Sequence, residues 1–530
     1  MSIQSKTINH REKECFPMNV LRKCIAFALI LCMLLPMLAC ASDQENNNEE
    51  KTTGAGNVES SGEAPDPFAG TDYKGKEFRI LTSTNAASVG MGNSNFMIEG
   101  TGQTGEDIVS NAVYQRNLDT EELLNVKLKF VRMDQTYDQV ANDIKRMVDV
   151  GTDDYDLIIN DLYPLAGLTY RGYFYNVADT GFENHIDLTQ NYWYSDYMKD
   201  ISLHEDYQFL MAGDYFADVL RSAHCLFYNK NLYENIYKDP DQLYNVVLNY
   251  EWTYDYWLKI LDNSYRDLNG NSTKDADDRY GLLVMEMWGT MIPMIVSGDC
   301  RYYARDTETG YPTLTIYNER SIKLVDTLYS IYYSEGTSPC GGGGTTAIFK
   351  ESDLLNAFME GKGLFVGYQR LGSLENVRNS PISIGVIPYP MLEASDKKYI
   401  TSSHDTTEIG AIPRTANPDN LPFITACIEV LCRESAKTVI PEYYETALKV
   451  KYASDANVAA MIDIIHDNFG NTFQLAYDTS LNSLFKNMFY ETIHSKSNKF
   501  SSSATRSTKK AENALNKIIQ TFEKDVVNKS

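Results

Sequence analysis

The stretch that most constrains the fold of this chain is residues 213–230, Gly-Asp-Tyr-Phe-Ala-Asp-Val-Leu-Arg-Ser-Ala-His-Cys-Leu-Phe-Tyr-Asn-Lys. Residues 217–228 contain no Gly or Pro and are rich in aliphatic and aromatic side chains, which predicts an interior strand. Strand and helix patterns alternate before this stretch, and a second unit rich in Trp and Tyr follows it. A strand joining two α/β lobes predicts a hinge with a ligand cleft beside it. The alternative is one more core strand in a single large domain.

Size and charge narrow the class of protein. A chain of 530 residues is long for one core and predicts two or three globular units. The net charge of -24 argues against nucleic-acid binding and suits a soluble protein outside the cell. The 37 tyrosines are unusual, and a phenol both stacks and hydrogen-bonds, which suits a cleft for sugars or peptides.

The N-terminus predicts export. Four basic residues precede an apolar run over residues 24–39: Arg11, Lys13, Arg22 and Lys23. This arrangement predicts a secretory signal peptide over residues 1–39. Met37-Leu38-Ala39-Cys40 resembles the lipobox of bacterial lipoproteins, whose cysteine is diacylated and becomes the mature N-terminus. We therefore expect lipidation at Cys40 and anchoring at the extracellular face of the cell membrane. The alternatives are a plain signal peptide or an uncleaved anchor helix.

The segment after Cys40 predicts a spacer. Residues 40–70 are rich in Ser, Asn, Glu, Gly and Pro and carry few apolar side chains, so we expect a flexible tether. The remaining cysteines show no metal-site spacing, and the one disulfide worth testing joins Cys300 and Cys340.

The first predicted lobe alternates strands at residues 76–82, 126–131 and 157–159 with helices at 105–124 and 137–148. Ser83 opens the loop after the first strand and Asp161 follows the third, at the edge where open α/β sheets hold ligands. Asp161 either binds a ligand hydroxyl or amine, or caps the next helix. Trp193 and Asp214 flank the approach to the hinge, where aromatic rings beside carboxylates favour carbohydrate binding. Core packing is the alternative for each of them.

The second lobe contains an Asp/Asn-rich loop. Side-chain oxygens fall at loop positions 1, 3, 5, 9 and 12: Asp267, Asn269, Asn271, Asp275 and Asp278. This spacing resembles dockerin and EF-hand loops, although Ser272 replaces the usual Gly and Lys274 stands where an apolar residue is expected. The loop therefore predicts a calcium site, with an Asx-rich turn as the alternative. We expect no required cofactor, and calcium is the only candidate.

Several short motifs together resemble one family. They are Tyr-Asp-Leu-Ile-Ile-Asn-Asp, Gly-Asp-Tyr, Phe-Tyr-Asn-Lys, Glu-Trp-Thr-Tyr-Asp, Asp-Asp-Arg-Tyr-Gly-Leu and Gly-Val-Ile-Pro-Tyr-Pro, after the lipobox. In this order and spacing they resemble the extracellular solute-binding lipoproteins of ABC importers, in particular the sugar-type proteins of Gram-positive bacteria. The resemblance covers residues 73–468 and implies an α/β two-lobed type II periplasmic-binding fold with hinge strands.

The resemblance adds one site residue, and local strand and helix patterns add three more. Trp288 falls where such proteins often present a stacking ring, and a strand at residues 363–366 delivers Tyr368 and Arg370 toward the cleft. Tyr444 lies in a predicted helix near the cleft. We expect a first lobe at 71–220, a second at 221–380, a return to the first lobe at 381–430 through a strand at 382–390, and C-terminal helices packed on the lobes at 431–530.

These features predict a non-enzymatic receptor that captures a solute, for which an oligosaccharide is favoured over a peptide, and passes it to ABC permease subunits. Both lobes must touch the solute for binding to favour closure. We expect a monomer that binds no nucleic acid. One alternative is a secreted glycoside hydrolase, for which Asp161 and Asp214 would be the two carboxylates. Another is a ligand-sensing lipoprotein partnered with a sensor kinase.

Overall fold

The computed structural model describes residues 66–85, 97–102, 108–179, 181–285, 287–342, 345–377, 379–404, 406–443, 456–470, 472–496 and 499–529. The predicted signal peptide, Cys40, most of the predicted tether and Tyr444 lie outside the described residues. Asp66–Ser530 forms one compact unit. Within the described residues, no helix has both the length and the apolar character that crossing a membrane requires.

The first lobe is built on a four-stranded sheet with the order β12-β3-β1-β2. Its strands are β1 Lys76–Asn85, β2 Val126–Thr136, β3 Leu157–Asp161 and β12 Glu408–Ala411. β1 runs parallel to β2 and β3, and β12 is antiparallel to β3, with Glu408 opposite Asp161. The strands predicted at β1, β2 and β3 are confirmed: apolar side chains of β1 and β3 are fully buried, whereas in β2 Val126 is buried and Leu128 and Phe130 are half-buried.

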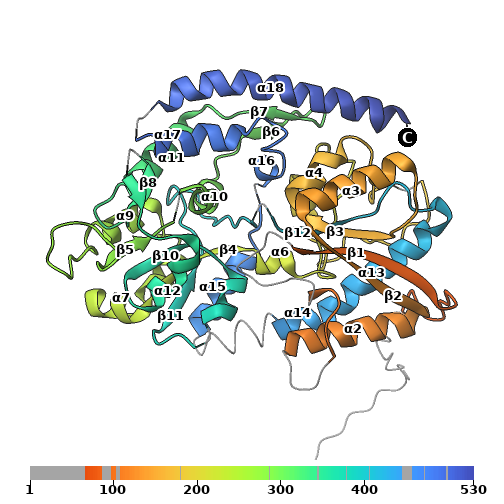
Figure 1. Ribbon diagram of the computed structural model, residues 1–530, viewed down its shortest axis with the longest axis horizontal. Coiled ribbons are helices and arrows are strands. Elements are labelled where there is room, and N and C mark those ends of the chain that lie inside the picture. The colour runs from red at the N-terminus through yellow and green to blue at the C-terminus, as the bar shows by residue number, and fades with distance from the viewer. Residues whose placement is uncertain are drawn as a thin grey trace, which may run out of the picture. The chain divides into compact units, whose positions relative to one another are not determined.

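Helices cover both faces of this sheet: α2 Ile108–Leu124, α3 Tyr137–Val150, α4 Leu162–Thr169 and α13 Leu421–Lys437. In Figure 1, α3 and α4 lie above the sheet, and α2 and α13 lie below it. α3 begins at a capping box formed by Thr136 and Gln139 and ends at Gly151, whose φ of 81° requires the left-handed region.

The second lobe has a sheet with the order β11-β4-β10-β5. Its strands are β4 His224–Asn229, β5 Tyr280–Leu283, β10 Gly363–Arg370 and β11 Ile384–Ile387. β4 is antiparallel to both neighbours, and β10 is parallel to β5. Trp252 and Trp257 pack against Phe365 of β10 and are fully buried. The surrounding helices are α7 Lys230–Tyr237, α8 Gln242–Leu248, α9 Tyr254–Asp262, α10 Met287–Ser297, α11 Glu319–Tyr332 and α12 Glu351–Met359.

Short elements and C-terminal helices complete the fold. The short elements are α5 Ser195–Asp200, α6 Asp218–Arg221, α14 Val439–Pro441, the hairpins β6 Tyr303–Arg305 with β7 Pro312–Leu314 and β8 Cys340–Gly342 with β9 Thr345–Ala347, and the turns η3 Leu371–Val377, η4 Pro418–Asn420 and η7 Val527–Lys529. The C-terminal helices are α15 Ala456–His466, α16 Phe473–Ala476, η6 Lys486–Tyr490, α17 Glu491–His494 and α18 Phe500–Asp525. α18 packs on Phe489 at its start and on Tyr207 and Phe209 near its end.

Two local expectations differ from the structure. Residues 217–228 are not one strand, because the short helix α6 precedes β4. The helix buries Asp218 and Arg221 one turn apart, 3.7 Å from each other, a pairing that strand propensity does not register. The predicted crossing at residues 382–390 also differs, since β11 pairs with β4 and the chain re-enters the first sheet at β12.

The candidate disulfide between Cys300 and Cys340 is not formed. Cys300 and Cys340 are buried free thiols, as are the other three cysteines of the described residues. Burial raises the pKa of both thiols to about 12, so these groups stay protonated at neutral pH.

Candidate functional site

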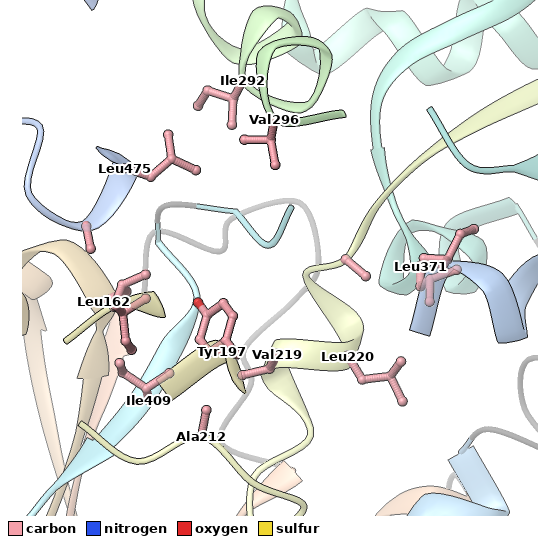
Figure 2. Packing of buried hydrophobic residues seen from close by; sticks show 14 of the residues in the cluster. Leu162, Tyr197, Ala212, Val219, Leu220, Ile292, Val296, Leu371, Ile409 and Leu475 are labelled. Atoms are coloured by element: carbon pink, nitrogen blue, oxygen red, sulfur yellow. The ribbon is translucent and has the colours of Figure 1, made fainter. Parts of the chain in front are cut away.

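Two chain segments run side by side between the sheets. One contains α6 and leads into β4, and the other, residues 401–407, leads into β12. The backbone N–H of His224 donates to the carbonyl of Ser402 at 2.9 Å, and that of His404 donates to Ser222 at 3.2 Å. Figure 2 shows the apolar packing around α6, with Val219 beside Tyr197 and Leu220 facing Leu371. These paired crossings are the elements about which the two lobes can move.

β10 carries a bulge where it reaches these crossings. Its register against β4 shifts between Val366 and Gln369, and Tyr368 adopts a φ of 61°. A tyrosine in the left-handed region is strained, and bulges near functional sites redirect side chains. The bulge also takes the Tyr368 N–H out of the ladder, and this group donates instead to the Tyr389 hydroxyl at 3.0 Å. The bulge therefore directs the Tyr368 ring toward the crossing segments.

Tyr368 meets His404 there. The phenol oxygen lies 2.6 Å from Nε2 of His404. The backbone N–H of Thr406 donates to Nδ1 of His404 at 3.2 Å, so Nδ1 is an acceptor. The neutral ring then carries its hydrogen on Nε2 and donates it to Tyr368, a tautomer assigned from the hydrogen-bond pattern. This contact links the second sheet to the segment that returns to the first.

His224 lies beside this pair. Its ring centroid is 5.5 Å from that of His404 and 6.2 Å from that of Tyr368. Nδ1 is 2.8 Å from the Ser402 hydroxyl, and Nε2 is buried with no hydrogen-bond partner among the described residues. Burial lowers the pKa of His224 well below its ordinary value, and the neighbouring His404 and Arg370 lower it further. His224 is therefore neutral at physiological pH.

Arg370 ends β10 next to a cavity of about 560 Å³. The cavity is lined by Tyr368, Gln369, Arg370, Ser373 and Asn376 together with residues 350–352 and 354–356 of the α12 region. Arg370 is only 3% exposed, and Nε and Nη1 have no hydrogen-bond partner among the described residues. Its guanidinium lies 5.7 Å from the centre of the Tyr368 ring.

A buried charge cluster connects this site to both lobes. Arg221 of α6 contacts Asp218 at 3.7 Å and Glu375 of η3 at 3.3 Å. Asp218 also accepts from the backbone N–H of Glu408 in β12 at 2.9 Å. Burial raises the pKa of Asp218, and the charges of Arg221 and Arg370 oppose that rise. The cluster holds the first crossing segment to one element of each lobe.

The structure describes the side chains of only some of the other predicted ligand residues. Ser83 lies in β1 and Trp288 in α10, but their side chains are outside what the structure describes, as is Tyr444. Asp161 is fully buried at the end of β3 and occupies the N-cap position of α4 without a side-chain capping hydrogen bond. These four residues remain predicted ligand contacts.

Trp193 and Asp214 are buried in the interior of the first lobe. Trp193 is 3% exposed, donates from Nε1 to Glu429 at 3.0 Å and covers Gly213, where a Cβ would meet its ring at 2.7 Å. Asp214 is 8% exposed and accepts from the Tyr194 hydroxyl at 3.2 Å. Burial raises the pKa of Asp214 to about 7. In this conformation the Trp193 ring has no open face for stacking.

The Asp/Asn loop is closed by its own hydrogen bonds. Asp267 accepts from the backbone N–H groups of Gly270 and Ser272, and Asp275 accepts from the side-chain amides of Asn269 and Asn271. Asp278 is fully buried and accepts from the Tyr265 hydroxyl and the Leu268 N–H. Within the described residues, no three His, Cys, Asp or Glu side chains are grouped to hold a metal ion. Calcium binding stays a prediction to be measured.

Sequence reasoning had no pattern for His224, His404, Asp218 and Arg221. The available signal was polar residues inside an otherwise apolar stretch, because a buried charge or imidazole needs a partner. That signal indicates that the stretch contains buried polar residues. It does not identify their partners, because His404 is far away in sequence.

Two α/β lobes, joined by paired crossing segments and followed by C-terminal helices, define the two-lobed fold of type II periplasmic binding proteins. The solved structure described as "Crystal structure of cyclo/maltodextrin-binding protein complexed with maltotetraose" is similar to this chain. The TM-score is 0.52 at 11% sequence identity, and the match covers 86% of this chain and 98% of that one. No family model and no curated protein matches the chain. The likeness confirms the predicted fold class.

Proposed function

We propose that the protein is an extracellular, lipid-anchored receptor that captures an oligosaccharide between its lobes and delivers it to an ABC import permease. The observation that carries the proposal is the polar site at the end of β10, where Tyr368 and Arg370 meet the crossing segments beside a cavity. The cavity is lined by the second lobe, and its Tyr368 reaches a crossing segment through His404. A ligand held there that also meets the first lobe on closure gains contacts, so binding energy can favour the closed form.

Two further lines support an oligosaccharide as the solute, and a third supports anchoring. The similar solved structure is, by its description, a cyclo/maltodextrin-binding protein holding maltotetraose. The site combines an aromatic ring with hydrogen-bonding groups from Tyr368, Gln369 and Ser373, the mixture that sugars require. The sequence adds the lipobox-like segment at Cys40, which supports membrane anchoring and an extracellular location.

The proposal is tested by a thermal-shift screen of the chain from residue 41 onward against neutral and acidic oligosaccharides and peptides. A ligand at one hundred times its Kd stabilises the folded state by about 2.7 kcal/mol, which raises Tm measurably. Every sugar that raises Tm is then recovered and checked by chromatography. An intact sugar supports the receptor, whereas a cleaved sugar favours the hydrolase and a peptide-only response removes the oligosaccharide assignment.

Anchoring and delivery need separate tests. Cys40→Ser should release the protein from the membrane fraction into the medium, while wild type stays with the membranes. Uptake of the identified sugar by cells should fall when the receptor is deleted and recover when it is restored. Unchanged uptake would contradict delivery to a permease even if binding is confirmed.

A further inference from the structure

Arg370 is a buried cation for which the described residues supply no acceptor. It is 3% exposed, and no hydrogen bond or ion pair joins its guanidinium to any described residue. Unsatisfied buried donors cost free energy, and such groups in a folded protein call for an explanation. The arginine also lines a cavity, so a ligand held there lies beside this side chain.

Arg116 shows how this chain satisfies a structural arginine. Arg116 is also fully buried without a carboxylate, yet its guanidinium donates four hydrogen bonds, to the carbonyls of Ile98 and Tyr215 and the side chains of Asn117 and Ser435, at 2.6 to 2.9 Å. Arg221, the other buried arginine of the site, contacts two acids. A structural role for Arg370 would lead us to expect partners of this kind.

The acids near Arg370 are already engaged. Asp218 interacts electrostatically with Arg370, but its ion pair is with Arg221 and its other oxygen accepts from the Glu408 N–H. Glu375 contacts Arg221. Around the cavity, Lys350 and Glu351 are both exposed and oppose each other in charge. In the part of the chain that the structure describes, no carboxylate is therefore bound to the Arg370 guanidinium beside the cavity.

The shape of the guanidinium selects the ligand group. Its donors form a planar fork that matches a carboxylate with two parallel hydrogen bonds, whereas a sugar hydroxyl accepts at only one point. Arg370 is already shielded from water, so a ligand that compensates its charge gains more than a neutral one.

We infer that the solute presents a carboxylate to Arg370, so that the oligosaccharides bound best are those containing uronic acids. This inference rests on the proposed function and specifies the solute class for that site.

The experiment compares acids with their own uncharged forms. Oligogalacturonates, oligomannuronates and glucuronoxylan oligomers are titrated calorimetrically into the chain from residue 41 onward, each beside its methyl ester and beside neutral oligosaccharides. At least one acid should bind about thirtyfold or more tightly than its ester, because losing one partner of a desolvated charge pair has effects of this size. Equal affinity for acid and ester, or binding of neutral sugars alone, overturns the inference and leaves the receptor proposal intact. Binding of no sugar overturns both.

Variants assign the preference to Arg370. Arg370→Gln should remove the difference between acid and ester and should leave Tm without ligand unchanged or raised, since an unpartnered buried cation is lost. Arg370→Lys keeps the charge without the fork and should restore part of the preference. Arg116→Gln is the matched control, which should lower Tm and keep the preference. A lowered Tm for Arg370→Gln with the preference retained would show a structural role and overturn the inference.

Discussion

The phenol oxygen of Tyr368 lies 2.6 Å from Nε2 of His404, a contact that joins a strand of the second sheet to the segment returning to the first. The two residues are 36 positions apart in the chain. Because Tyr368 also lines the cavity, a ligand there adjoins a hydrogen bond between the moving elements. Occupation of the site can therefore be coupled to the arrangement of the crossings.

Tyr368→Phe should weaken ligand binding. The variant keeps the ring and removes only the hydroxyl, so we expect a loss of about 0.5–1.5 kcal/mol in binding free energy, measured by calorimetry with the sugar found in the screen. Tyr254→Phe is the matched control, because Tyr254 is a buried phenol bonded to the Met294 carbonyl at 2.7 Å. It should lower Tm without changing affinity. Equal affinities for wild type and Tyr368→Phe would remove this hydroxyl from the site.

Asp214 should make stability depend on pH. Burial raises its folded pKa to about 7 from the ordinary 3.8, so the folded state holds the proton more tightly than the unfolded state. The stabilisation is fully present below about pH 4 and is lost as pH rises toward 7, by at most about 1.4 kcal/mol per pH unit. Asp214→Asn lacks this titration, so its stability relative to wild type should increase from pH 5 to pH 7 in urea unfolding. Parallel curves for the two proteins would contradict the raised pKa.

Trp193→Phe distinguishes core packing from ligand stacking. The substitution removes the Nε1 donor that Glu429 accepts at 3.0 Å inside the first lobe. Leaving that buried carboxylate with one partner fewer should cost about 1–3 kcal/mol of unfolding free energy, while ligand affinity stays as in wild type. The measurement is urea unfolding combined with calorimetry. Reduced affinity at unchanged stability would instead place Trp193 in the binding surface, as the sequence predicts.

Calcium binding by the 267–278 loop has a definite signature. An ion there would have to displace the Asn269 and Asn271 amides from Asp275, because a cation needs those oxygens facing it. Calcium should then raise Tm with increasing concentration, chelation should reverse the rise, and Asp275→Asn should abolish it. A Tm that does not change up to millimolar calcium would leave the loop as an Asx-rich turn.

Local elements of this fold were predictable because their signals are local. The apolar spacing of α3 and the short apolar run of β3 each identify an element within a few residues. The prediction of one strand over residues 217–228 was wrong. The composition of this stretch favours a strand, but the burial of Asp218 and Arg221 as a pair favours one helical turn. Propensity is weak where a long-range contact can override it.

The site was predictable only in part, for a similar reason. Tyr368 and Arg370 were identified because a strand pattern ends at the expected cleft. The bulge that redirects Tyr368 depends on pairing with β4, and His404 enters from a distant segment. The burial of Trp193 is decided by Glu429, 236 residues away, so aromatic composition could not separate a stacking ring from a core ring.

The sequence by itself determined the α/β alternation, the two lobes and the strand that carries Tyr368 and Arg370, because side-chain periodicity is set by each segment's own backbone geometry. The tertiary structure alone decided that β11 belongs to the second sheet, that α6 interrupts the first crossing and that Nε and Nη1 of Arg370 are buried without an acceptor among the described residues. These features depend on which distant groups meet, and a hydrogen bond or an ion pair is defined by distance in space, which one chain position does not encode.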